Sequence, residues 1–134
     1  MTREEILALG PGLELDALVA EKVMEWKPCA SGTEGWYDQP PARPWDEGGH
    51  PGYCRSVFPG TGGQRRLFLP SSDLLHAWEV VEELHRRGKG VALKKYRPGD
   101  LVPEHHRASI YDERGNEDGY GLTMPLAICR AALL

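Results

Sequence analysis

The chain has 134 residues, a net charge of −4 at pH 7, 40% hydrophobic residues and 27% charged residues. This length allows one domain with a hydrophobic core, and the composition excludes an intrinsically disordered chain. The negative charge argues against a general nucleic-acid binder, and no apolar stretch reaches the roughly 18 residues that a membrane helix needs. Because the N-terminus lacks a signal-peptide pattern and the cysteines lack a disulfide-framework spacing, we expect a cytoplasmic protein with free thiols.

The first 26 residues predict two helices separated by the Gly-Pro-Gly of residues 10–12. Thr2 and Glu5 have the spacing of a capping box, which starts the first helix. The second helix, over residues 13–26, has an apolar stripe interrupted only by Lys22: Leu15, Leu18, Val19, Val23 and Trp26. Its acidic residues lie off this stripe, so the helix should lie on the surface of the core: Glu14, Asp16, Glu21 and Glu25.

Residues 27–64 show neither a helical nor a strand period, and they are rich in Gly, Pro, Trp and Tyr. Within them we predict a strand only at residues 53–58. The next segment, residues 66–70, predicts a short strand that ends at a proline. Most of this region should therefore be an irregular loop.

A third helix follows, with Ser71, Ser72 or Asp73 as its cap and Gly88 as its end. Its predicted apolar face contains Leu74, Leu75, Ala77, Trp78, Val81 and Leu84. Two antiparallel strands are then predicted at residues 90–97 and 105–112, followed by a turn over residues 113–121.

The final helix follows Thr123 as its cap and has Pro125 in its first turn. It is apolar on nearly all sides, since Arg130 is the only polar residue from Leu126 to Leu134. A surface helix of a monomer has a polar face, so this helix must be covered on more than one side. Either it lies centrally under a sheet, or another copy of the chain covers part of it in an oligomer.

Charge is unevenly distributed along the chain. Residues 1–50 hold ten acidic and four basic residues, a net charge of −6. Residues 85–107 hold seven Lys or Arg against Asp100 and Glu104, a net charge of +5, with three histidines among them. This segment would attract an anionic ligand, although a solvated sheet face without a ligand has the same composition.

Motifs for metal binding and catalysis are weak. Five residues are of the right types for zinc, but no Cys-x-x-Cys pair occurs: Cys29, His50, Cys54, His105 and His106. We expect ordinary thiols instead, with Cys129 buried as a small hydrophobic residue. There is no Gly-x-Ser-x-Gly elbow and nothing singles out a pair of carboxylates, so we assign no catalytic residue, no metal and no cofactor.

Residues 58–66, with the sequence FPGTGGQRR, look like a phosphate-binding loop, because small residues let backbone N–H groups approach a ligand. The segment lacks the Lys-Ser/Thr ending of a P-loop, so the match to nucleotide hydrolases is weak. Two interpretations remain. It is a glycine hairpin between two strands, or it binds a phosphate with Arg65 and Arg66 without hydrolysing it.

The tryptophans fall into two groups. Trp26 and Trp78 lie on apolar helix faces, so we expect both in the core. A second group of rings lies on or beside a proline-restricted loop, where it could stack on a nucleobase: Trp36, Tyr37, Trp45 and Tyr53. The alternative is that this loop buries its own rings as an accessory core.

Three segments together resemble a known family: ELDALVAEKVMEW at residues 14–26, PSSDLLHAWEVVEEL at residues 70–84 and PLAICRAALL at residues 125–134. They resemble the phage ABA sandwich domain family of Firmicutes-type phages and prophages. The resemblance implies an α+β fold, an α/β sandwich in which a small antiparallel sheet packs against about three to four helices. It implies no enzyme activity. We expect one domain over residues 1–134, with an irregular insertion at about residues 27–64, where the chain departs from the family pattern.

We therefore expect a non-catalytic phage protein that binds and sequesters a small anionic ligand, such as a cyclic nucleotide immune signal, inside the infected bacterium. We also expect a homo-oligomer formed through the C-terminal helix. The predicted ligand-binding residues are Trp36, Tyr37, Trp45, Arg65, Arg66, Lys94, Lys95 and Arg97. The alternatives are a phage factor that binds and inhibits a host protein and, with less support, a small hydrolase or nuclease.

Overall fold

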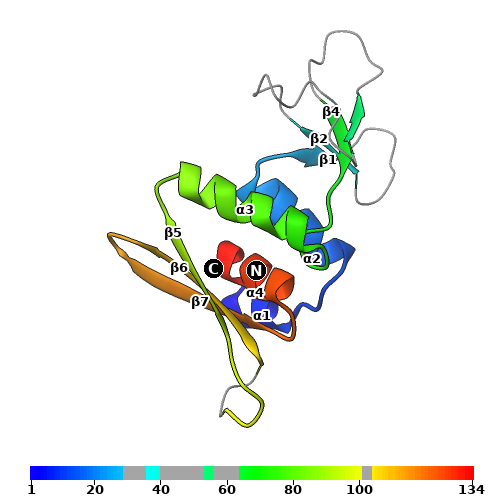
Figure 1. Ribbon diagram of the computed structural model, residues 1–134. Coiled ribbons are helices and arrows are strands. Elements are labelled where there is room, and N and C mark those ends of the chain that lie inside the picture. The colour runs from blue at the N-terminus through cyan, green and yellow to red at the C-terminus, as the bar shows by residue number, and fades with distance from the viewer. Residues whose placement is uncertain (29–35, 40–52, 56–63, 101–103) are drawn as a thin grey trace.

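A computed structural model of the chain describes residues 1–28, 36–39, 53–55, 64–100 and 104–134. Side chains are described for these residues except 27–28, 36–39, 53–55 and 64–66. The fold is α+β: four α-helices pack on one side of a three-stranded antiparallel sheet, and a second, four-stranded sheet lies beyond the helices (Figure 1). The predicted fold class is confirmed.

Both predicted N-terminal helices are present. Helix α1 (Arg3–Ala8) begins at the predicted capping box, in which the Glu5 N–H donates to Thr2 Oγ1 at 3.2 Å and the Thr2 N–H donates to the Glu5 carboxylate. Helix α2 (Leu13–Leu18) continues directly into a π-helical segment, η1 (Val19–Val23). The predicted apolar stripe is largely correct, since Leu15, Val19, Val23 and Trp26 are all buried.

One acidic residue of α2 is buried, contrary to the sequence pattern. Asp16 is only 1% exposed. The cost of burying its carboxylate is offset by a hydrogen bond that its Oδ1 accepts from the Ser71 backbone N–H at 2.7 Å. Burial raises the pKa of this carboxyl above its ordinary value. The Ser71 Oγ accepts a further bond from the Gly12 N–H at 3.0 Å. These bonds tie the start of α2 to the segment before α3, a long-range contact that the pattern of one helix cannot reveal.

Helix α3 (Leu74–Arg86) begins at Asp73, whose carboxylate accepts hydrogen bonds from the backbone N–H groups of Leu75 and His76. Gly88, with φ of 84°, lies just after its end, as predicted. The apolar face was predicted only in part, because the buried residues are Ala77, Val80, Val81 and Leu84.

The expectation that Trp78 lies in the core is wrong. Its side chain is 49% exposed, and Leu74 and Leu75 beside it are 55% and 78% exposed. The apolar arc of α3 is wider than the face that the rest of the core covers, so these residues lie at its outer edge. Trp26 is buried as expected, with its ring 4.7 Å from the ring of Phe68.

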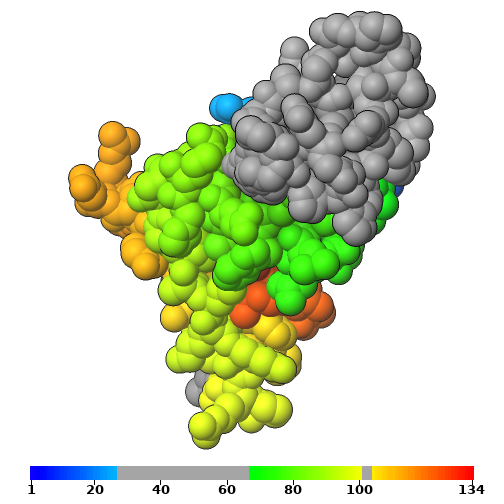
Figure 2. Space-filling model, turned by 45° about the horizontal axis from the view of Figure 1, so that its top comes forward, coloured from blue at the N-terminus to red at the C-terminus, as the bar shows by residue number. Residues whose placement is uncertain are grey.

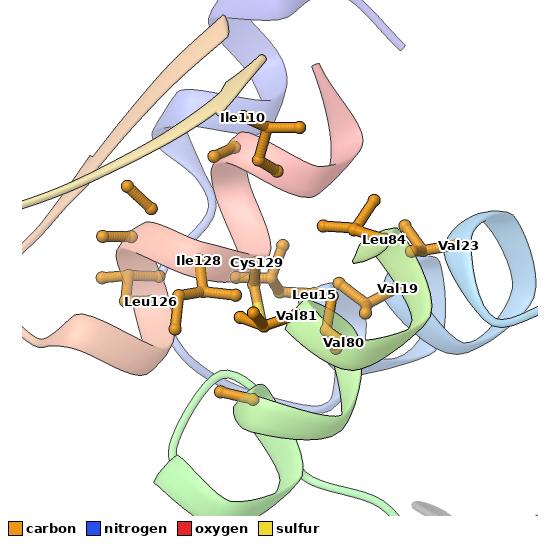
Figure 3. Packing of buried hydrophobic residues seen from close by; sticks show 14 of the residues in the cluster. Leu15, Val19, Val23, Val80, Val81, Leu84, Ile110, Leu126, Ile128 and Cys129 are labelled. Atoms are coloured by element: carbon orange, nitrogen blue, oxygen red, sulfur yellow. The ribbon is translucent and has the colours of Figure 1, made fainter. Parts of the chain in front are cut away.

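Helix α4 (Met124–Leu133) lies between the other helices and the three-stranded sheet (Figure 1). It follows Thr123 and carries its proline in the first turn, as predicted. Residues 126–131 are buried, and Figure 3 shows Ile128 and Cys129 packed near Leu15, Val80 and Val81. The central position predicted as one alternative is confirmed, and the composition of α4 needs no second copy of the chain. An oligomer through α4 stays a prediction.

The cysteine predictions can be followed for one residue. Cys129 is a free, buried thiol, and burial raises its pKa well above the ordinary value, as expected for a cysteine that serves as a core residue. Cys29 and the side chain of Cys54 lie outside the described part of the chain.

Arg130 is buried in α4, and its guanidinium is bonded on all sides. Nε and Nη2 donate to the Leu9 carbonyl at 3.1 and 2.9 Å, and Nη1 donates to the Tyr120 carbonyl and to Glu104 Oε2, both at 2.7 Å. The side chain therefore joins the connection between α1 and α2, the last strand and the segment before β6. A buried charge with this many partners is a structural residue.

The three-stranded sheet has the order β5-β6-β7, with β5 at Gly90–Lys95, β6 at His106–Asp112 and β7 at Gly115–Gly121. Strands β5 and β6 confirm two predictions. The predicted turn over residues 113–121 is wrong, because β7 occupies most of it and only Glu113 and Arg114 form the turn.

Glycine in β7 reflects close packing, and this explains why β7 looked like a turn. A Cβ on Gly119 would lie 2.3 Å from the Ala131 nitrogen, and one on Gly121 would lie 2.8 Å from the Ala127 nitrogen. The absence of side chains at these positions lets α4 lie directly against the strand.

The four-stranded sheet has the order β1-β2-β4-β3, with β1 at Lys27–Pro28, β2 at Trp36–Gln39, β3 at Tyr53–Arg55 and β4 at Gln64–Leu67. Strand β3 confirms the first three residues of the strand predicted at 53–58, and residues 56–58 lie outside the described residues. Strand β4 overlaps the start of the strand predicted at 66–70. The loop-like prediction for residues 27–64 is wrong for β1 and β2. These strands have only two and four residues, too few to leave a recognisable period of two in the sequence.

Candidate functional site

The three-stranded sheet has one covered face and one open face. Ala108, Ile110, Gly119 and Gly121 lie against the helical side, which carries all four helices (Figure 1). Because side chains alternate along a strand and opposed residues share a face, the intervening positions point away from the helices. We call this surface the open sheet face: Gly90, Ala92, Lys94, Tyr96, Arg107, Ser109, Tyr111, Asn116, Asp118 and Tyr120.

Two cations of the open sheet face lie directly opposite each other. Lys94 pairs with Arg107 in the β5–β6 ladder, and both contact the ring of Tyr96. The Lys94 Nζ is 4.7 Å from the ring centroid, and the Arg107 Cζ is 5.8 Å from it. Like charges opposed across strands repel, whereas an aromatic ring attracts each cation. Tyr96 therefore holds two mutually repelling cations together, an arrangement that a bound anion would stabilise.

Arg107 also interacts with Tyr120 on the neighbouring strand β7. It lies opposite Tyr120 in the β6–β7 ladder, and hydrogen bonding to the Tyr120 side chain raises the pKa of Arg107 above its ordinary value. Within the described part of the chain, neither Lys94 nor Arg107 forms an ion pair with a carboxylate. The nearby Asp118 carboxylate contributes to the raised pKa of Arg107 without forming an ion pair with it. Neither cation is therefore neutralised by a direct ion pair.

Lys95 and Arg97 lie at the same end of the sheet. Lys95 pairs with His106 in the ladder, and by alternation it belongs to the opposite face from Lys94. Arg97 is exposed in the turn after β5, where its backbone N–H donates to Asp100. Figure 2 shows this end of β5 and the following turn, in yellow-green to yellow, projecting from the body of the molecule. The three predicted cations therefore lie at one accessible end of the sheet, with Lys94 and Lys95 on opposite faces.

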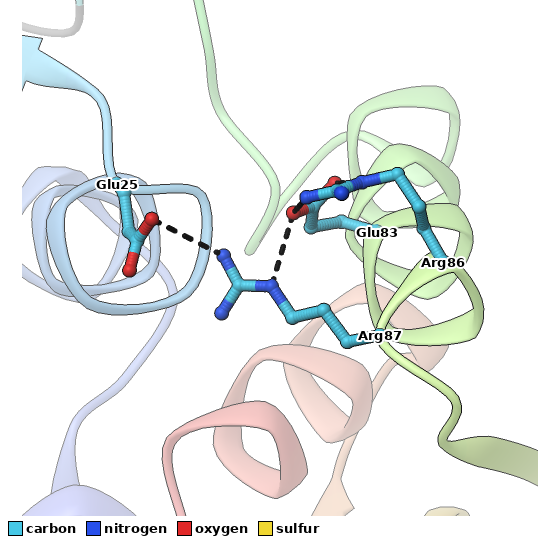
Figure 4. A network of polar contacts seen from close by, with 4 residues as sticks. All are labelled: Glu25, Glu83, Arg86 and Arg87. Atoms are coloured by element: carbon cyan, nitrogen blue, oxygen red, sulfur yellow. Dashed lines mark hydrogen bonds and ion pairs between the residues drawn. The ribbon is translucent and has the colours of Figure 1, made fainter.

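Two other arginines of the predicted basic segment are neutralised. Glu83 is buried and accepts hydrogen bonds from Arg86 and from Arg87 Nε, the latter at 3.0 Å (Figure 4). Bonding from Arg86 is the main reason that the pKa of Glu83 is lowered. Arg87 Nη2 also lies 3.8 Å from Glu25 Oε2, at the end of η1. Arg86 is bonded within α3, and Arg87 links the end of α3 to Glu25. Within the predicted basic segment, these two charges are therefore less available to a ligand than that of Lys94.

Four of the remaining predicted ligand residues lie on strands β2 and β4. The register places Tyr37 opposite Arg66, Asp38 opposite Arg65 and Trp36 opposite Leu67 in the four-stranded sheet. Figure 1 shows that sheet on the far side of the helices from β5. Trp45 and the side chains of Trp36, Tyr37, Arg65 and Arg66 lie outside the described part of the chain. The role of these five residues stays a prediction.

The glycine-rich segment can be followed only at its ends. Strands β3 and β4 pair in antiparallel fashion, as a hairpin would require. The glycines of residues 60–63 lie outside the described residues, so both interpretations of this segment remain predictions.

Sequence reasoning missed several residues of the open sheet face. Ser109 Oγ donates to Asp118 Oδ1 at 2.6 Å, and the Asn116 side chain lies 3.4 Å from the same oxygen. Asp118 and Tyr120 could have been found only by treating residues 115–121 as a strand. Alternation in residues 90–96 and 105–111 could have placed Tyr96 beside Lys94 and Arg107.

A pocket of about 300 Å³ lies at the opposite end of the sheet, between the ends of α3 and α4 and the β6–β7 turn. Its charged lining is balanced, with Lys89 and Arg114 against Asp112 and Glu117. Glu117 forms an ion pair with Arg3. This balance makes the pocket less suitable for an anion than the Lys94–Arg107 pair.

An apolar patch forms the second notable surface. It consists of Leu74, Leu75 and Trp78 on α3, each at least 49% exposed. Large exposed apolar side chains gathered in one place are typical of protein-binding surfaces.

Two further properties bear on the class of protein. No helix in the described ranges is long and apolar enough to cross a membrane. In the same ranges, no group of three or more His, Cys, Asp or Glu side chains is arranged to hold a metal ion.

The fold and the site define a small α+β sandwich domain with helices on one face of an antiparallel sheet and a cationic, aromatic opposite face. The chain matches the Phage ABA sandwich domain over residues 17–133, and it belongs to this family. The family prediction is confirmed. The fold is similar to the 2.0 Å crystal structure of a phage protein from Bacillus cereus ATCC 14579, with a TM-score of 0.58 and 21% identity over 94% of this chain and 91% of that chain. No curated protein matches the chain.

Proposed function

We propose that this phage-family protein binds and sequesters a small anionic ligand, such as a cyclic nucleotide immune signal, in the cytoplasm of an infected bacterium. The observation that carries the proposal is the pair of opposed cations, Lys94 and Arg107, which contact the Tyr96 ring and form no ion pair with a carboxylate of the described residues. A phosphate group would offset their repulsion, and this makes the site selective for anions.

The chemistry of the side chains fits a phosphate. The Arg107 guanidinium can donate two parallel hydrogen bonds to phosphate oxygens, and the Lys94 ammonium supplies a mobile charge from the neighbouring strand. Tyr96 and Tyr120 border the pair and offer ring surface to a nucleobase, where stacking contributes about 1 to 3 kcal/mol per base.

Sequestration fits the site better than turnover. Within the ladders, the open sheet face carries no histidine and no cysteine. His105 lies opposite Tyr96 just beyond them, and no hydrogen bond among the described residues joins its side chain to a hydroxyl group. Ser109 donates to the Asp118 carboxylate, but no third group in the described part of the chain orients this pair in the way that a catalytic base is oriented in a triad. Binding alone requires only the cations and rings that are present. The proposal therefore excludes turnover of the bound ligand.

The test is to denature the purified protein, identify any released ligand by mass spectrometry, and titrate the protein with a panel of cyclic nucleotides by calorimetry. Lys94→Ala and Arg107→Ala should each weaken binding by about tenfold or more, since each removes a charge-assisted contact. Lys89→Ala is the matched control, because Lys89 is an exposed cation that precedes the same strand. Altered ligand after incubation would indicate an enzyme, and absence of binding to every nucleotide would contradict the proposal.

The predicted contribution of the four-stranded sheet is tested with the same titration. Trp36→Ala and Arg65→Ala should weaken binding without unfolding the chain if this sheet takes part in binding. Unchanged affinity in both variants would restrict the site to the open sheet face.

A second candidate function is supported by the apolar patch of Leu74, Leu75 and Trp78. These residues would suit docking on a host protein, because aromatic and aliphatic anchors dominate protein interfaces. This candidate predicts that Leu75→Ala and Trp78→Ala abolish the effect of the protein in cells, while Lys94→Ala leaves it unchanged. The opposite outcome would favour the ligand-binding proposal.

A further inference from the structure

Asp118 is a carboxylate placed next to the proposed anion site, where its negative charge would repel a bound anion. It lies opposite Ser109 in the β6–β7 ladder. The Arg107–Tyr120 pair lies two residues away on each strand, and because side chains alternate it is on the same face. Asp118 contributes to the raised pKa of Arg107. It would still repel a bound phosphate, and a hydrogen bond accepted from another part of the ligand would offset that repulsion. Its position therefore carries information about that other part.

The two oxygens of Asp118 differ in their surroundings. Oδ1 accepts from Ser109 Oγ at 2.6 Å and lies 3.4 Å from Asn116 Nδ2. No hydrogen bond from the described residues reaches Oδ2. The carboxylate is thus fixed by its neighbours and offers one oxygen to a ligand. One oxygen suits a single hydroxyl donor, whereas the edge of a guanine base would use both oxygens.

Spacing agrees with a sugar hydroxyl. Residues two apart on one face of a strand are separated by roughly 6.5 to 7 Å, so Asp118 lies that far from Tyr120, which faces Arg107. In a nucleotide, the sugar lies directly beside the phosphate. Carboxylates that accept from ribose hydroxyls are a general solution for recognising the sugar of a nucleotide.

We infer that the open sheet face selects ribonucleotides over 2′-deoxyribonucleotides, with Asp118 accepting a hydrogen bond from a ribose hydroxyl while Lys94 and Arg107 bind the phosphate. This inference depends on the proposed function, because it assigns the sugar of the same ligand. Ser109 and Asn116 are positioning residues, since they orient the Asp118 carboxylate.

The experiment compares matched ribose and 2′-deoxyribose ligands by calorimetry: AMP with 2′-deoxy-AMP, and cyclic di-AMP with its 2′-deoxy analogue. In the wild-type protein the ribose form should bind about tenfold more tightly, the range expected for one hydrogen bond to a charged acceptor. Asp118→Ala should reduce this ratio to about one, and the deoxy form should bind the variant at least as tightly as the wild type. Glu113→Ala is the matched control, because Glu113 is an exposed carboxylate in the β6–β7 turn.

Three outcomes would overturn the inference. Equal binding of ribose and deoxyribose forms to the wild type would show that the sugar is not read, while the proposed function would stand. A ratio that survives in Asp118→Ala would assign the selection to another residue. If neither nucleotide pair binds, the inference fails, and titration with pyrophosphate then decides whether the anion site of the proposed function is also absent.

Discussion

The two faces of the three-stranded sheet are built from the same strands but from opposite kinds of residue. The covered face has Ala108, Gly119 and Gly121, which are small enough for α4 to lie against the backbone. The open sheet face has Lys94, Tyr96 and Arg107, which are long, polar-tipped and partly or fully exposed. Alternate residues of one strand thus serve packing and binding separately, so substitutions one residue apart should affect different properties.

Between a buried and an exposed position, the largest difference in the free energy of unfolding is expected at two tryptophans. Trp26 is 7% exposed and packs on Phe68, whereas Trp78 is 49% exposed. Trp26→Ala should lower the free energy of unfolding by about 3 to 5 kcal/mol, as expected for a large-to-small substitution in a core. Trp78→Ala should lower it by about 1 kcal/mol or less, since surface substitutions have small effects. Denaturant unfolding followed by circular dichroism measures both, and equal losses would mean that Trp78 is covered in solution.

The covered sheet face should be intolerant of a single added carbon. Gly119→Ala places a Cβ 2.3 Å from the Ala131 nitrogen and 2.5 Å from the Ala127 carbonyl oxygen, both in the backbone of α4. Helix and strand must then separate, and we expect a loss of about 3 kcal/mol. Gly10→Ala is the matched control, since no heavy atom lies within 4 Å of the added Cβ there. If Gly119→Ala unfolds at the same denaturant concentration as wild type, α4 does not pack as closely as described.

Most of the helical framework could be predicted from sequence because its signals are local. The capping box at Thr2, the cap at Asp73 and the end near Gly88 depend on neighbouring residues, and all three were found at or next to their predicted positions. Strand β7 could not be predicted, because its glycines suggest a turn. They are glycines because α4, a later part of the chain, packs directly against them. The burial of Asp16 depends in the same way on Ser71.

The candidate site was predictable only in part. The basic segment identified Lys94, Lys95 and Arg97, since charge can be read from sequence. The contacts of Tyr96 with Lys94 and Arg107 depend on strand register, and the pairing of Asp118 with Ser109 depends on a strand that resembled a turn. Sequence alone therefore identified positive charge near the candidate site. It did not identify the arrangement of rings, cations and carboxylate from which we propose the class of ligand.

Arg130 links the edge of the covered face to the N-terminal segment. Arg130→Met keeps much of the apolar volume but leaves the carbonyls of Leu9 and Tyr120 and the Glu104 carboxylate without this donor. Unpaired acceptors are costly when buried, so we expect a loss of about 2 kcal/mol in the free energy of unfolding. Arg114→Met, at an exposed position in the β6–β7 turn, should change it by less than about 0.5 kcal/mol. A loss no larger than in this control would mean that water replaces the guanidinium.

On the open sheet face, we expect a small unfavourable coupling free energy between two cations. In a double-mutant cycle with Lys94→Gln and Arg107→Gln, the coupling between the two cations should be unfavourable by about 0.5 kcal/mol, because opposed like charges repel. Salt screens such surface charges, so thermal unfolding in about 1 M NaCl should bring the coupling close to zero.

A cycle between Lys94 and Arg114, which lies in the β6–β7 turn, supplies the control and should show no coupling at either salt concentration. Unfavourable, salt-sensitive coupling in the ligand-free protein is the condition that a bound anion would relieve, so added ligand should also remove it. A favourable coupling, or one that salt leaves unchanged, would mean that Tyr96 and Tyr120 already satisfy both cations. The open sheet face would then have no electrostatic reason to bind an anion, whatever its charge.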